Sequence, residues 1–165
     1  MKTALNHFAG YPCLIFPASR LLEKDADKIE TGLGEFLQHW ESHGTAVEGG
    51  FVILEDRFVV VAHRPQEISG CGRDDLLVAM NEIGKEIGVE WLGASHIFYR
   101  NADGKPIDVD RLEFKKRSQA GEVTPETIVF DTTIRETNPI LEGKFALPAS
   151  QSWHLRLMGP VLKAV

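Results

Sequence analysis

Apolar positions in the first half of the chain follow two periods, one typical of strands and one typical of helices. Residues 11–18 form an apolar run bounded by prolines, and they predict a first strand that ends at Pro17 because proline cannot donate to a strand ladder. Between residues 23 and 40, apolar side chains recur every three or four positions and predict an amphipathic helix that stops at His43-Gly44. This apolar stripe consists of Ile29, Leu33, Phe36, Leu37 and Trp40.

Two further β-like runs, residues 46–54 and 58–63, are separated by three polar residues and predict a hairpin. The second run reads Phe-Val-Val-Val-Ala-His, and such an uninterrupted apolar run indicates a strand covered on both faces. A second helix is expected over residues 73–88, where Asp74 and Asp75 suit the positive end of its dipole. Residues 94–100 predict a fourth strand, closed by the turn Asn-Ala-Asp-Gly.

The element order predicts an α+β fold of the ferredoxin-like, split βαβ kind over residues 1–102. That plan has an antiparallel sheet of order 4-1-3-2 with both helices on one face. Residues 103–165 predict a small C-terminal α+β subdomain packed on it, in which Asp108 or Asp110 caps a short helix that runs to Lys116. Residues 127–134 are β-like, and residues 153–157 alternate like a last strand.

Charge and composition exclude several classes of protein. A net charge of −6 over 165 residues argues against a nucleic-acid partner, because such binding needs a basic face that displaces counterions. No stretch approaches the roughly 20 apolar residues that cross a bilayer, and the N-terminus lacks the apolar core of a secretory signal. Two cysteines cannot form a disulfide framework. We therefore expect a cytoplasmic protein with free thiols and no membrane partner.

The predicted topology brings several polar residues to one border of the sheet. The third strand runs antiparallel to the first two, so its end at His63 should lie beside their starts, where Cys13 and His43 stand. Arg100 ends the fourth strand on the same side. The loop after the third strand leads to Ser-Gly-Cys-Gly-Arg at the start of the second helix. From that loop the border should receive Ser69, Gly70, Cys71, Gly72 and Arg73.

Three functions fit this border. The first is a binding or regulatory module for a small anion, held at the helix N-terminus by Ser69, Gly70, Gly72, Arg73 and Arg100. The second is a thiol-dependent enzyme in which Cys71 is the nucleophile and His43 or His63 is its base. The third is a structural subunit of a homo-oligomer, such as a homodimer, that associates through its sheet face or edge strand.

Each of these residues also has a structural interpretation. Cys71 can be a small buried residue in a tight turn whose flanking glycines take positive φ. His43 can be a histidine at a helix C-terminus, and His63 a hydrogen-bonded residue at a strand end. The sequence lacks a phosphate loop, a G-x-S-x-G elbow, an H-E-x-x-H motif and a dinucleotide fingerprint. Its two cysteines lie far apart without paired ligand spacing, so neither a metal nor a cofactor is expected.

Four blocks resemble those of a small, uncharacterised bacterial family. Residues 36–44 are similar to its F-x-x-x-W-x-x-H-G segment, and residues 58–62 with 69–74 resemble its strand and S-G-C-S-x-D box, with Gly72 where the family more often has serine. Residues 124–131 and 148–154 resemble its T-P-x-T-x-V-F-[DN] and P-A-x-x-S-W-H blocks. Members sometimes carry the label "ABC transporter ATPase", which the absent phosphate loop does not support. The resemblance implies a shape and a recurrent box, and no known reaction.

Overall fold

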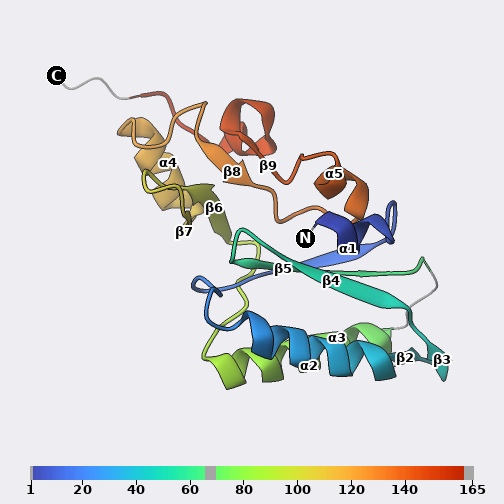
Figure 1. Cartoon of the computed structure of the whole chain (residues 1–165). Coiled ribbons are helices and arrows are strands. Elements are labelled where there is room, and N and C mark those ends of the chain that lie inside the picture. Colours follow the sequence, from blue (N-terminus) through green and yellow to red (C-terminus); the bar gives the residue numbers. More distant parts are fainter. Residues whose placement is uncertain (1, 66–69, 162–165) are drawn as a thin grey trace. The chain divides into compact units, whose positions relative to one another are not determined.

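The computed structural model describes residues 2–65 and 70–161 of the chain, which divides into two compact units (Figure 1). Unit 1 comprises Met1–Leu92 and Ile134–Leu141, and unit 2 comprises Gly93–Thr133 and Glu142–Val165. The fold is mixed α+β with antiparallel sheets, as the sequence predicted. Whether residues 1–102 and 103–165 act as separate folding domains stays a prediction.

Unit 1 is built on a three-stranded antiparallel sheet of order β1-β5-β4. Its strands are β1 (Cys13–Pro17), β4 (Gly49–Leu54) and β5 (Phe58–His63). Every residue of β5 is buried, which confirms the central, doubly covered position expected from its apolar run. The hairpin of β4 and β5 pairs Leu54 with Phe58, and it turns through Glu55 and Asp56, which both have positive φ.

Helices cover both faces of this sheet. Helices α2 (Ala26–His39) and α3 (Gly70–Ile87) lie together on one face, and the short α1 (Lys2–Asn6) lies on the other with α5 (Thr137–Leu141) beside it (Figure 1). Two adjacent glycines of β4 let both layers approach closely. A Cβ on Gly49 would meet Leu37 and Trp40 of the α2 side, and one on Gly50 would lie 2.5 Å from Phe8.

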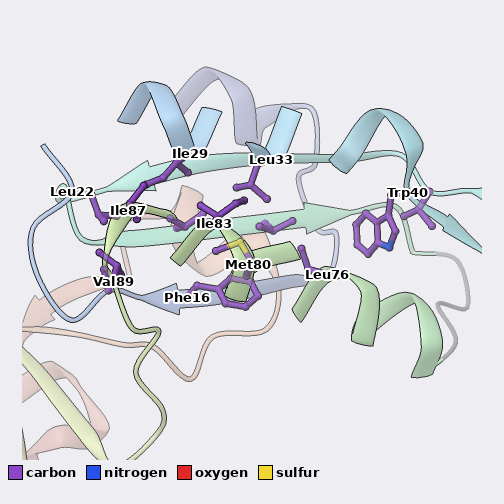
Figure 2. Packing of buried hydrophobic residues seen from close by; sticks show 14 residues of the cluster. Phe16, Leu22, Ile29, Leu33, Trp40, Leu76, Met80, Ile83, Ile87 and Val89 are labelled. Atoms are coloured by element: carbon purple, nitrogen blue, oxygen red, sulfur yellow. The ribbon is translucent and has the colours of Figure 1, made fainter. Parts of the chain in front are cut away.

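The main core of unit 1 fills the space between the sheet and helices α2 and α3. Figure 2 shows its side chains gathered around Leu76 and Met80, with Trp40 at one end and Leu22, Ile87 and Val89 at the other. The predicted stripe positions Ile29 and Leu33 are completely buried in it. The cluster consists of Phe16, Ala18, Leu22, Ile29, Leu33, Trp40, Val47, Val59, Val61, Leu76, Met80, Ile83, Ile87 and Val89.

Unit 2 is a four-stranded antiparallel sheet of order β7-β6-β8-β9 with one helix and two 3₁₀ segments. Its strands are β6 (His96–Arg100), β7 (Pro106–Asp110), β8 (Ile128–Phe130) and β9 (Ala146–Pro148). The remaining elements are α4 (Arg111–Gln119), η1 (Ala149–Gln151) and η2 (Trp153–Leu157). One apolar cluster of unit 2 consists of Ile97, Tyr99, Phe114, Val123, Val129 and Ala149, and Phe98, Phe130 and Phe145 are buried as well.

The ferredoxin-like strand order is not confirmed, because the predicted fourth strand, β6, belongs to the sheet of unit 2 and does not pair with β1. Two local causes explain the difference. A turn in which Asn101 accepts from the N–H groups of Asp103 and Lys105 folds β7 back onto β6 and gives it a near partner. The outer side of β1 is taken at one end by Trp91, which bridges Ala18. At the other end it is taken by Arg135, whose carbonyl accepts from the Cys13 N–H.

Three local predictions have mixed outcomes. Asp110 does cap α4, since its carboxylate accepts from the Glu113 N–H at 2.7 Å. Residues 153–157 are the 3₁₀ helix η2 and not a strand, so that prediction is wrong. His43 and Gly44, with φ of 51° and 73°, form the turn of a small hairpin between β2 (Glu41–Ser42) and β3 (Thr45–Ala46), beyond the end of α2.

Candidate functional site

The candidate site is the opening of α3 in unit 1, where the described part of the helix begins at Gly70. Gly70, Cys71 and Arg73 are exposed there, and Gly72 is buried. Both glycines belong to the helix, and Gly72 has no positive φ, so the turn conformation suggested for them by the sequence is wrong. The predicted ligand residue Ser69 lies outside the described residues.

Trp40 anchors this opening to the rest of unit 1. It follows the last residue of α2 and is almost fully buried, and its indole Nε1–H donates to the Gly72 carbonyl at 2.9 Å. Its ring meets His63 edge-on, with the ring centroids 5.7 Å apart and the planes at 84°. One side chain thus connects the end of α2, the start of α3 and the end of β5. Those elements are far apart in the sequence.

His63 is a buried neutral imidazole behind this opening. Its Nδ1 lies 2.8 Å from the Arg64 carbonyl, which accepts only, so Nδ1 carries the proton and Nε2 keeps the lone pair. Burial lowers the pKa of His63 from its ordinary 6.5, and the positive charge of Arg73 lowers it further, against the opposite effect of the Arg64 hydrogen bond. The histidine is therefore uncharged at neutral pH, and the charge of Arg73 acts on it.

The two cysteines have opposite environments. Cys71 is exposed at the start of α3, whereas Cys13 is buried at the start of β1. Burial raises the pKa of the Cys13 thiol to about 11, although the charge of Arg135 partly opposes this. Cys13 therefore stays a protonated thiol at neutral pH, and Cys71 is the accessible one of the pair.

The remaining predicted residues are His43 and Arg100, which belong to different units. His43 is exposed at the tip of the β2–β3 hairpin, and β2 contacts α3. Among the described residues, no hydrogen bond joins the Cys71 side chain to His43 or His63. Arg100 ends β6 in unit 2, where it donates to the Gly104 carbonyl at 3.1 Å and lies 5.4 Å from the Phe130 ring centroid. Its predicted place beside β1 depended on a strand pairing that does not occur.

Unit 2 contains a polar cluster that the sequence interpretation did not find. The Ser152 hydroxyl lies 2.7 Å from His154 Nδ1, and the Trp153 indole stacks on the His154 ring and donates to Asp131 at 3.0 Å. His154 is 1% exposed, and burial lowers its pKa to about 4 despite the raising effect of Asp131. The signal available was the run Ser-Trp-His itself, which alternation assigned to a strand.

No family model, no curated protein and no solved structure matches this chain. In the part of the chain that the structure describes, His, Cys, Asp and Glu side chains form no group of three or more that could hold a metal ion. The described helices include none with both the length and the apolar character needed to cross a membrane. The chemistry of the site therefore has to be argued from its own geometry.

Proposed function

We propose that the chain is a cytoplasmic binding or regulatory module whose ligand, a small anion, binds at the opening of α3. The observation that carries the proposal is the first described turn of α3 (Gly70–Ile87), in which Gly70, Cys71 and Arg73 are exposed. Main-chain N–H groups at a helix start have no partner within the helix, and the helix dipole adds to their attraction for an anion.

The surroundings support this proposal in two ways. The bond from Trp40 to the Gly72 carbonyl fixes the first turn, so an anion would meet N–H groups that are already oriented. Gly70 carries no side chain that could screen its main chain, and among the described residues no atom lies within 4 Å of a Cβ built on it. This turn would therefore lose little conformational entropy when a ligand binds.

Two carboxylates should limit the affinity. Asp74 and Asp75 are exposed in the next turn of the same helix, where their charge opposes that of Arg73. The proposed site should therefore bind a small anion weakly. Removing the charge of Arg73 should lower the affinity, and removing the charges of Asp74 and Asp75 should raise it. This response separates binding at α3 from general salt effects, which act on the whole surface alike.

The test is thermal unfolding of the full chain with inorganic phosphate, sulfate and a nucleoside triphosphate, each at constant ionic strength. A ligand at ten times its dissociation constant should add about 1.4 kcal/mol of stability, a rise of a few degrees in the midpoint. Arg73→Gln should remove the rise, and Asp74→Asn with Asp75→Asn should increase it. Lys85→Gln is the matched control, because this cation lies in the last turn of the same helix.

The proposal fails if none of the three anions raises the midpoint, or if Lys85→Gln reduces the rise as much as Arg73→Gln does. A rise that is unchanged by the aspartate substitutions also contradicts binding at α3. Titration calorimetry on the same variants gives an independent dissociation constant.

Thiol-dependent catalysis is a second candidate, favoured by the exposure of Cys71. The neutral imidazole of His63 is in the protonation state that a general base needs. Its Nδ1–H donates to the Arg64 carbonyl, and Nε2 carries the lone pair that would accept a proton. The rate of Cys71 alkylation against pH tests this candidate in a Cys13→Ser background. An inflection at the free-cysteine value of about 8.5 would count against an activated thiol, as would an unreactive one.

A further inference from the structure

The open edge of the unit 1 sheet is a feature that the proposed function does not use. Within the described residues, β4 is the last strand on its side of the sheet, with β5 as its only ladder partner. An edge strand presents main-chain donors and acceptors to its surroundings, and natural proteins usually cover or blunt such an edge. Helices α1 and α2 contact β4 from its two faces and leave its outer side between them (Figure 1).

The register shows which main-chain groups point outward. The Arg64 N–H donates to the Glu48 carbonyl, and this pair continues the β4–β5 ladder by one step beyond Gly49 and His63. Hydrogen-bonded pairs alternate along an antiparallel ladder, so the even-numbered residues of β4 bond to β5. The N–H and C=O groups of the odd-numbered residues, Gly49, Phe51 and Ile53, therefore point away from β5.

A hollow of about 450 Å³ lies along this outer side. Phe51 and Val52 both line it, although neighbouring side chains of a strand point to opposite faces, so the hollow must lie at the edge of β4 itself. Ala4 of α1 lines it on one side, and Leu22, Ala26 and Glu30 line it on the α2 side. A main-chain edge between two such walls has the form of the sites at which extended peptides add a strand.

The charges along the hollow indicate what kind of ligand it favours. Glu30 of α2 and Asp56 of the hairpin turn both line it, and both are exposed. In the described part of the chain, no ion pair engages either carboxylate. Glu55 and Glu48 stand at the two ends of β4, the latter paired with Arg64. A ligand with positive side chains complements this edge, and an acidic one is repelled.

We propose that the β4 edge binds an extended basic peptide by strand addition. The peptide main chain pairs with the outward N–H and C=O groups of Gly49, Phe51 and Ile53. Its alternate side chains then face α1 or α2, and a lysine or arginine on the α2 side reaches Glu30. A second basic side chain near the hairpin reaches Asp56, so the peptide is selected by spacing as well as by charge.

Pairing of two copies of this chain through β4 is the competing use of the same edge. A two-fold antiparallel pair would bring Glu55 and Asp56 of one copy beside Glu48 of the other, where Arg64 offsets only one of the three negative charges at each end of the joint. Like charges placed opposite one another across strands are destabilising. Charge therefore favours the basic peptide over a second copy.

The test uses the full chain and a dye-labelled, seven-residue peptide in which lysine alternates with valine, followed by fluorescence anisotropy. Two N-methylated forms of this peptide carry the methyl groups on alternate amides, one form on each edge of the extended strand. Strand addition predicts that one form loses binding and that the other keeps it, because only one edge faces β4. A peptide with glutamate in place of lysine should not bind.

Substitutions connect the binding to this edge. Glu30→Gln combined with Asp56→Asn should weaken binding about fivefold, as expected for two exposed charge pairs. Asparagine is chosen because Asp56 has a φ of 51°, which that residue tolerates. Glu35→Gln on the same helix, away from the hollow, is the control and should leave the affinity unchanged. Circular dichroism of each variant verifies the fold.

Several results would overturn the proposal. One is equal binding of the two N-methylated forms, which would mean charge attraction without strand pairing. Others are equal binding of the glutamate peptide, no binding of the lysine peptide, or loss of binding in Glu35→Gln. Sedimentation of the chain alone tests whether two copies pair through β4. A dimer that the lysine peptide does not dissociate would mean that this edge binds a second copy.

Discussion

The two units differ in the form of their apolar packing, although side-chain hydrogen bonds connect elements in both. In unit 1 a continuous layer of aliphatic and aromatic side chains fills the space between one sheet face and two long helices. Unit 2 has a small apolar cluster, and short elements there are tied by side-chain hydrogen bonds. The Ser118 hydroxyl accepts from the Gly159 N–H at 3.0 Å, and Arg117 donates to the Tyr99 hydroxyl at 2.7 Å. Apolar burial is non-directional and tolerant, whereas hydrogen-bonded anchors depend on a few atoms.

The largest loss of stability is expected from a substitution in the unit 1 core. Leu33→Ala should cost about 3–4 kcal/mol of unfolding free energy, because Leu33 is fully buried between helices and sheet and its removal leaves a cavity. Urea unfolding measures the loss. Leu77→Ala on α3 is the control, since Leu77 is 45% exposed and should change stability by about 0.5 kcal/mol at most. Similar losses in both variants would contradict this account of the core.

Acid should act most strongly on unit 2, through His154. Above about pH 6.5 the histidine is neutral in both states, and as the pH falls towards 4 only the unfolded chain binds the proton. Stability should therefore decrease between pH 6.5 and 4, by about 3 kcal/mol in total. His63 contributes in the same direction in unit 1, because its pKa is also lowered.

Urea unfolding over this pH range checks the prediction, with amide hydrogen exchange of η2 as the local signal for unit 2. His154→Gln removes the titrating group and should flatten the pH dependence, whereas His39→Gln, at an exposed position of α2, should not. An unchanged slope in His154→Gln would show that other groups cause the acid sensitivity.

Replacing each of two glycines of α2 by alanine should change the stability of unit 1 in opposite directions. A Cβ on Gly32 would lie 2.9 Å from Ile83 Cγ1 of α3, so Gly32→Ala should destabilise unit 1 by about 1–2 kcal/mol. No atom of the described residues lies within 4 Å of a Cβ at Gly34, so Gly34→Ala should stabilise the helix by up to about 1 kcal/mol. Thermal unfolding of the two variants side by side is the measurement. A gain in both would mean that α2 and α3 are less closely packed.

The smallest expected effect concerns the start of α4 in unit 2. Asp110→Ala removes the acceptor for the Glu113 N–H and should cost about 1 kcal/mol. Asp110→Asn keeps a side-chain oxygen at this position and should be nearly neutral. Amide hydrogen exchange of α4 locates the change, and an equal loss in both variants would point to charge and not to capping.

The candidate site was predictable in part. The apolar run of β5, the stripe of α2 and the start of α3 were each evident locally, so His63 and Gly72 could be expected near one border. The indole bond from Trp40 that joins them was not evident, because a periodic pattern shows which side chains are buried but not which polar atom each one meets. Arg100 was included because β6 was expected to pair with β1, and that pairing does not occur, since strand pairing depends on competition between edges and the nearby β7 provided the closer partner.

Local sequence patterns predicted the positions of the long elements, the burial of β5, the amphipathic face of α2 and two candidate caps for α4, Asp108 and Asp110. These follow from side-chain periodicity and local hydrogen bonding, which act over a few residues. Tertiary structure alone decided which sheet received β6, which cysteine stayed exposed, how His154 was buried and which edge of the unit 1 sheet stayed open. Those outcomes depend on contacts between residues far apart in the chain, where the free energies of alternative pairings are compared across the whole molecule.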